Sequence, residues 1–167
     1  DNLINIDADF THSHGMKGEH AHDETASITW LDFSQAVEQA ESILHALAEN
    51  FPEYESDFGR NYNQLKQDLL NLDQQLENLV QNKPALTLLA SHPVYQYMQR
   101  RYGLSIETMH WEPDEYPNDN EWIKFGNLLG DHSAQWMLWE DVPLDETTEK
   151  LASIGIKSLV FSPCEKA

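Results

Sequence analysis

Hydrophobic residues in the first half of the chain recur at the spacing of α-helices. Between residues 34 and 50, apolar side chains return every three to four positions after Ser34, a suitable helix N-cap. Pro52 disfavours helix at the residue before it, so this first helix should end near residue 50. The pattern therefore predicts one amphipathic helix that begins at residue 34.

A longer helix is predicted for residues 53–82. Its apolar positions step alternately by four and three residues and form one stripe: Phe58, Tyr62, Leu65, Leu69, Leu72, Leu76 and Leu79. Such a stripe fits a coiled-coil partner or an intramolecular contact. We expect the intramolecular contact, with the helix lying along the sheet of its own domain, because an amphipathic helix beside a globular sequence normally packs on it.

The pattern changes after Pro84 to short apolar runs that alternate with helical segments. Strands are predicted at 85–91, 105–111, 134–140 and 157–162, and helices near 93–102, 119–129 and 145–153. Alternation of this kind predicts an α/β fold: a four-stranded parallel sheet flanked by helices, with the long helix as a backbone. We divide the chain into a His-rich acidic tail (1–26), a helical segment (27–82) and an α/β lobe (83–167).

Potential metal ligands follow the predicted strands. In open parallel sheets, ligands bind beyond the carboxyl ends of the strands. Those ends carry, in chain order, His92, then His110 and Glu112, then Glu140 and Asp141, then Ser162 and Cys164. For His110 and Glu112 the pattern favours a solvated loop, although both stand where they could assist His92. The ligands should therefore gather at one edge.

Charge and motifs narrow the function. With 29 acidic and 10 basic residues, the net charge of −19 repels phosphate, so nucleic acid and anionic membrane surfaces are excluded as partners. No stretch approaches the roughly 20 apolar residues of a membrane span, so no membrane insertion is expected. The chain has neither a glycine-rich phosphate loop nor a nucleophile elbow. We therefore expect a binding protein rather than an enzyme.

Residues 11–24, THSHGMKGEHAHDE, concentrate further metal-binding chemistry. Two His-x-His pairs are separated by a glycine-containing segment that can fold back and bring them together: His12, His14, His20 and His22. Imidazole and carboxylate groups are ligands that zinc and its first-row neighbours prefer. A solvated polar loop or a tag remnant is the alternative, but the interruptions by Ser13, Ala21 and the glycines favour a natural metal-handling loop.

Several segments, in order, resemble one family of proteins. They are Trp30-Leu31-Asp32, the two helices, SHPVYQYMQRRYGL (91–104), EPDEYP (112–117) and WEDVPLDETTEKLASIGIKSLVFSP (139–163). They resemble the zinc- or manganese-binding substrate-binding proteins of ABC importers, which are periplasmic or lipid-anchored. The resemblance implies a non-catalytic, extracytoplasmic protein that passes metal to a membrane permease, and it makes residues 11–24 a zinc-collecting loop. It also implies an amino-terminal lobe that this sequence lacks.

The family's ligand pattern is eroded in this chain. The histidine of its H-x-W-L-D motif is Ile28 here, and the aspartate that ends its last strand is Ser162. His92 keeps the family's histidine, and Glu140 matches a glutamate that is not generally a direct ligand. The expected metal residues are therefore His92 and the four loop histidines, with zinc as the ion and manganese, or no bound ion, as alternatives. A rival hypothesis is a diverged binding or scaffold domain whose metal contact is confined to the loop.

Overall fold

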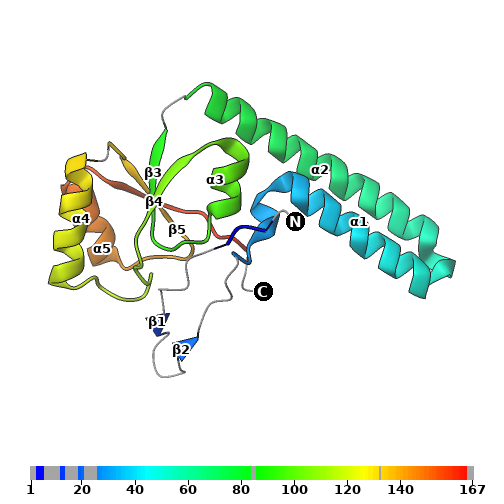
Figure 1. Ribbon diagram of the computed structural model, residues 1–167, viewed down its shortest axis with the longest axis horizontal. Coiled ribbons are helices and arrows are strands. Elements are labelled where there is room, and N and C mark those ends of the chain that lie inside the picture. Colours follow the sequence, from blue (N-terminus) through cyan, green and yellow to red (C-terminus); the bar gives the residue numbers. More distant parts are fainter. Residues whose placement is uncertain are drawn as a thin grey trace.

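The computed structural model describes residues 3–5, 12–13, 19–20, 26–83, 86–131 and 133–164. It has a four-stranded, wholly parallel sheet in the order β4-β3-β5-β6, and a two-stranded antiparallel pair, β1-β2 (Figure 1). The main strands are β3 (Thr87–Ala90), β4 (Ser105–Thr108), β5 (Trp136–Trp139) and β6 (Lys157–Val160). The predicted α/β fold is confirmed. Each strand is shorter than its predicted apolar run, and the described flanking residues of the run lie in loops.

Helices cover both faces of the sheet. Helix α3 (Gln96–Tyr102) lies on one face, and α4 (Asp119–Asp131) and α5 (Asp145–Ser153) lie on the other (Figure 1). Alternate residues of β3 supply the two cores: Leu88 and Ala90 join the α3 side, whereas Leu89 joins the α4–α5 side. This alternation is what the pleat of a strand buried on both faces requires.

The first helical region is a hairpin. Helix α1 (Phe33–Asn50) packs antiparallel to α2 (Glu55–Gln81), with a short 3-10 turn, η3 (Pro52–Tyr54), between them (Figure 1). The N-cap of α1 is Asp32 rather than Ser34, because Asp32 Oδ1 accepts hydrogen bonds from the backbone N–H groups of Ser34 and Gln35 at 3.1 and 3.3 Å. An aspartate in this position is a strong capping residue.

The prediction that α2 lies along the sheet is wrong. Helix α2 points away from the sheet and packs on α1 along most of its length, and only its last turns reach the sheet core, through Leu76 and Val80 (Figure 1). The predicted stripe is therefore split. Phe58, Tyr62, Leu69 and Leu76 are half-buried, whereas the other three members, Leu65, Leu72 and Leu79, are exposed by 46 to 55%.

A partly buried ion-pair network fastens the last turns of α2 to α3. Arg101 on α3 donates two hydrogen bonds to the Asp73 carboxylate, from Nε at 3.0 Å and from Nη2 at 2.6 Å, and a third to Glu77 at 3.0 Å. The Tyr102 hydroxyl donates to Asp73 Oδ1 at 2.8 Å. The hydrogen bond from Arg101 is the main reason why the pKa of Asp73 is lowered, despite its burial.

Hydrogen bonds also join the segment after β6 to the segment before α1 and to the start of α3. Trp30, within the 3-10 turn η2 (Thr29–Leu31), donates from Nε1 to the backbone oxygen of Pro163 at 2.6 Å. The Tyr95 hydroxyl donates to the backbone oxygen of Phe161 at 2.7 Å. No helix of the described residues combines the length and the apolar character that crossing a bilayer requires.

Candidate metal centre

Three side chains that could ligate a metal meet at the edge where the sheet strands end. His92 follows β3, Glu140 follows β5 directly, and Glu112 follows β4. In this sheet β4 and β5 pair with opposite sides of β3. The chain therefore runs from β3 to β4 on one side and then crosses to β5 on the other, so the strand order reverses at β3. Such a reversal is where open α/β sheets place their ligands.

Backbone hydrogen bonds extend the ladder beyond the strands and hold these segments in place. The Ser91 N–H donates to the Leu138 oxygen at 2.9 Å, and the Trp111 N–H donates to the Ser91 oxygen at 3.0 Å. The residues that precede His92 and Glu112 are therefore joined directly to each other, and the first is joined to β5. The three candidate ligands share one rigid frame as a result.

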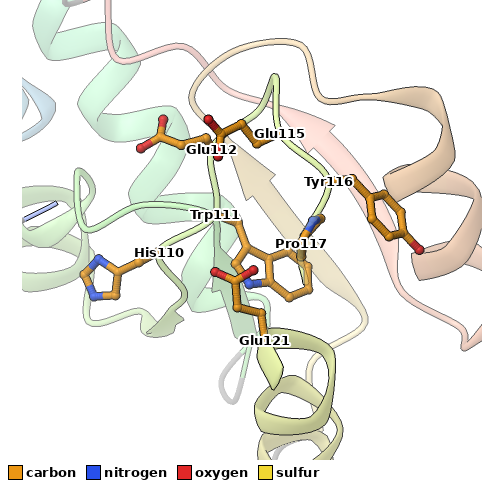
Figure 2. Close-up of a pocket in the computed structure, with 7 residues that line it drawn as sticks. All are labelled: His110, Trp111, Glu112, Glu115, Tyr116, Pro117 and Glu121. Atoms are coloured by element: carbon orange, nitrogen blue, oxygen red, sulfur yellow. The ribbon is translucent and has the colours of Figure 1, made fainter. Parts of the chain in front are cut away.

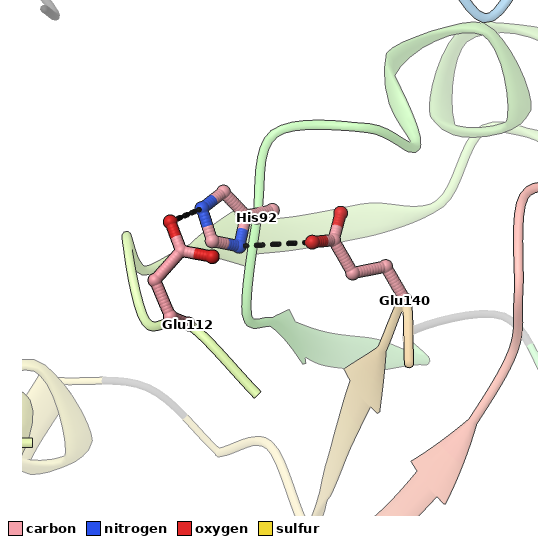
Figure 3. Close-up of side chains that lie close together, drawn as sticks. All are labelled: His92, Glu112 and Glu140. Carbon is pink, nitrogen blue, oxygen red and sulfur yellow. Dashed lines mark ion pairs between the residues drawn. The ribbon is translucent and has the colours of Figure 1, made fainter. Parts of the chain in front are cut away.

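The His92 imidazole lies between the two carboxylates (Figure 3). Its Nε2 is 3.3 Å from Glu112 Oε1, and its Nδ1 is 3.6 Å from Glu140 Oε1. The side chains of His92, Glu112 and Glu140 are 5, 21 and 16% exposed. One nitrogen or oxygen atom from each residue can be chosen so that all three atoms lie within 4.8 Å of one another.

The arrangement has the chemistry of a divalent metal site. In such sites one imidazole nitrogen binds the metal, while the other donates to a carboxylate that fixes the orientation of the ring. Here His92 Nε2 and a carboxylate oxygen of Glu112 are the candidate ligand atoms. Glu140 lies beside Nδ1, where it can orient the His92 ring or contribute an oxygen ligand to the metal. Without a metal, the same groups form an ion pair whenever the imidazole is protonated.

Comparison with known families assigns the chain. The family model described as "Zinc-uptake complex component A periplasmic" (ZnuA) matches residues 2–167. The chain belongs to this family. A curated protein of Chlamydia trachomatis serovar D, described as "Putative metal-binding protein", is 26% identical over 105 residues, which are 63% of this chain and 38% of that protein.

Solved structures share the ZnuA-family fold seen here. The metal-dependent lipoprotein YcdH of Bacillus subtilis superposes with a TM-score of 0.79 at 19% identity, over 92% of this chain and 58% of that one. The Zn(II)-bound ZnuA-like domain of Streptococcus pneumoniae AdcA gives a TM-score of 0.79 at 19% identity, over 86% and 55% of the two chains. The chain therefore spans little more than half the length of these structures.

The two positions at which the resemblance implies a replaced ligand, Ile28 and Ser162, have different surroundings. Ile28 is 3% exposed and belongs to the hydrophobic core on the α3 side. Ser162 uses its hydroxyl oxygen to accept a hydrogen bond from the Cys164 N–H at 3.3 Å. Glu112, which the resemblance did not mark as a ligand, lies closer to His92 than Glu140 does, at 3.3 Å against 3.6 Å.

The interpretation of Glu112 as part of a solvated loop is therefore wrong, because its side chain is mostly buried against His92. His110 is exposed, as expected for a solvated residue, and its ring centroid is 6.4 Å from that of His92. The signal that distinguishes Glu112 in the sequence is its place two residues after His110, where the chain turns back over the strand ends. The direction in which its side chain points depends on the path of that loop.

The His-rich segment is described only in part. β1 (His12–Ser13) pairs antiparallel with β2 (Glu19–His20), and His12 stands opposite His20 in the register. The pairing therefore brings the backbones of these two histidines side by side. His14 and His22 lie outside the described residues.

Proposed function

We propose that this chain is the carboxyl-terminal, metal-holding part of a substrate-binding protein that supplies zinc to an ABC importer outside the cytoplasm. The observation that carries the proposal is the cluster of His92, Glu112 and Glu140 at the carboxyl ends of the strands. Membership of the ZnuA family supports this reading. The metal is cargo in this proposal, and no bond chemistry is required of the protein.

The chain's own residues would hold and release that cargo. His92 Nε2 and Glu112 supply the first contacts, and Glu140 keeps the imidazole in the tautomer that leaves Nε2 able to bind. The loop histidines would collect metal at the surface: His12, His14, His20 and His22. In the same proposal, the collecting loop is residues 1–26, the linking helices are residues 27–82, and the metal-holding lobe is residues 83–167. A second lobe completes the binding protein, and a membrane permease receives the metal.

A specific observation favours manganese as a second candidate cargo. Two of the three grouped side chains are carboxylates, and oxygen ligands suit manganese as well as zinc. The rival hypothesis, a lobe that has lost the interlobe site and binds metal only through its loop, is supported by the replacement of family ligands at Ile28 and Ser162. These alternatives are separated by which histidines the binding depends on.

Calorimetric titration of the full chain with Zn²⁺ and Mn²⁺ tests the proposal. In a variant whose four loop histidines are alanine, zinc binding should persist and should weaken by about 100-fold or more on His92→Ala, because a direct ligand matters at least as much as a supporting one. Glu112→Gln should weaken it by about 10-fold to 100-fold. His45→Ala is the matched control, since His45 is exposed on α1.

The outcomes separate the hypotheses clearly. Zinc binding that disappears with the loop histidines and is indifferent to His92→Ala would support the rival hypothesis and overturn ours. Tighter binding of Mn²⁺ than of Zn²⁺ in the loop variant would identify manganese as the cargo.

A further inference from the structure

The three residues of the metal centre stand at different distances from the strands that carry them. Glu140 directly follows β5, His92 follows β3 with one residue between, and Glu112 follows β4 with three residues between. Backbone hydrogen bonds of the two neighbours of Glu112, Trp111 and Pro113, join its loop to the segments after β3 and β5, at 3.0 Å each. These bonds fix the path of the loop, whereas the depth at which it sits depends on side-chain packing.

Trp111, the residue before Glu112, anchors this loop in the core. It is 2% exposed, and its ring packs on those of Trp122, Phe125 and Trp139, with centroid distances of 4.8, 4.9 and 6.4 Å. The first two rings belong to α4, and the third ends β5. Figure 2 shows the indole directed towards α4, the helix at the bottom of the view, and the Glu112 carboxylate directed away from it. The indole therefore supports the loop from the core side.

The indole leaves one of its own polar groups unpaired in this position. Among the described residues, the buried Nε1 of Trp111 has no hydrogen-bond partner. A buried donor without an acceptor lowers the stability of the fold. A phenyl ring would avoid that loss but would fill less of the space between the loop and α4. What the indole supplies here is its bulk.

Zinc binding would require accurate placement of Glu112. A tetrahedral zinc ion with its ligand atoms at about 2.1 Å holds any two of them about 3.4 Å apart. His92 Nε2 and Glu112 Oε1 are 3.3 Å apart, so the pair already has the spacing of two zinc ligands. Such a spacing has to be held to within about 0.5 Å by residues whose own side chains are locked by packing.

We propose that Trp111 is a positioning residue of the metal centre, whose indole holds Glu112 at ligand spacing from His92. The inference rests on the proposed function for the identity of the centre, but the placement of the carboxylate can be measured without metal. A phenyl ring in place of the indole leaves space beside α4, and the surrounding structure relaxes only partly into such space. Glu112 then shifts relative to His92 or loses its single position.

The first experiment compares zinc titrations of two variants in the full chain with alanine at the four loop histidines. Trp111→Phe should weaken zinc binding about 10-fold, at the lower end of the effects of residues that support a ligand. Trp122→Phe is the matched control, because this ring belongs to the same cluster and its buried Nε1 also has no partner among the described residues. Trp122 does not adjoin a metal-centre residue in the chain, so zinc binding should stay close to that of the starting chain.

A combined variant shows whether Trp111 acts through Glu112. Trp111→Phe together with Glu112→Gln should bind zinc about as weakly as Glu112→Gln alone, because the ring then has no carboxylate to position. Coupled residues depart from additivity in this way, whereas independent ones do not. Effects that multiply, or equal losses from Trp111→Phe and Trp122→Phe, would overturn the proposal.

The second experiment needs no metal. Crystal structures of the metal-free chain with and without Trp111→Phe should differ at Glu112, whose carboxylate moves away from His92 or becomes disordered, while the 3.6 Å separation of His92 Nδ1 and Glu140 is retained. An unmoved Glu112 carboxylate would contradict the positioning role. If His92→Ala leaves zinc binding unchanged, the proposed function fails, and this pair of structures still decides whether Trp111 places Glu112.

Discussion

Replacing Asp73 by alanine should loosen the attachment of the helical hairpin to the sheet lobe. The Asp73 side chain is only 10% exposed and accepts two hydrogen bonds from Arg101 and one from Tyr102. Its loss leaves a guanidinium and a buried hydroxyl without their main acceptor. The effect should therefore appear as a lower free energy of unfolding of the whole chain.

The expected size follows from the contacts. Hydrogen bonds to a charged group contribute about 1.5–3 kcal/mol each, but they are not additive. Arg101 is 30% exposed and keeps Glu77 at 3.0 Å, so part of the loss is recovered by that carboxylate and by water. We expect Asp73→Ala to lower the free energy of unfolding by about 2–3 kcal/mol, and Asp73→Asn, which keeps an oxygen acceptor, by about half as much.

Urea unfolding monitored by tryptophan fluorescence measures the change, and Asp57→Ala is the control. Asp57 lies on the same helix and pairs with Arg60, but its side chain is 56% exposed, so its loss should cost less than about 0.5 kcal/mol. A double-mutant cycle with Arg101→Ala should show a coupling energy above about 1 kcal/mol. If Asp73→Ala and Asp57→Ala destabilise the chain equally, burial of the network does not anchor the hairpin, and the reasoning fails.

Three further predictions concern pH, the loop and the core. The folded-state pKa values of Asp32 and Asp73 are lowered, so their contribution to stability is complete above the unfolded value of about 3.9 and lost as the pH falls through the folded values; acid unfolding of Asp73→Asn should accordingly be shallower than that of the unsubstituted chain. Zinc taken up by the loop should fall steeply below about pH 6.5, where free histidines protonate, and replacing all four loop histidines by alanine should abolish that pH-dependent fraction in a titration. Ile28→His should lower the free energy of unfolding by about 1–3 kcal/mol in urea, because it places a polar ring in the core; an equally stable variant with tighter zinc binding would show instead that this position still faces the metal.

The helical pattern predicts that α2 exists but not what it packs against. A repeat of four and three residues defines a stripe of apolar side chains. Three of its members, Leu65, Leu72 and Leu79, are nevertheless exposed, whereas Asp73, which is outside the stripe, is buried. Hydrophobic periodicity does not register a buried carboxylate, because its burial depends on Arg101, 28 residues away in the sequence. The packing partner of α2 is therefore a tertiary property that the local pattern cannot contain.

The sheet and the gathering of ligands at its edge are predictable for a different reason. Parallel strands must end at a common edge, so the positions of His92 and Glu140 follow from the strand assignments alone. The approach of Glu112 to His92 depends on the loop after β4, where the Trp111 N–H bonds to the Ser91 oxygen. A hydrogen bond between two strand extensions leaves no mark in the sequence pattern, and the loop was consequently interpreted as solvated.

The hairpin is attached to the sheet lobe at one end only, through the start of α1 and the last turns of α2, and this makes α2 a lever. With 27 residues at about 1.5 Å each, the helix is about 40 Å long, and its contacts with the sheet lobe are confined to its final turns. The far end, Glu55, lies 18 residues or about 27 Å from Asp73, so a tilt of about 5° at the Asp73–Arg101 pivot displaces it by about 2.4 Å. Movements too small to disturb the metal centre are thus magnified at the opposite end of the molecule, where whatever docks on the tip of the hairpin would experience them at full amplitude.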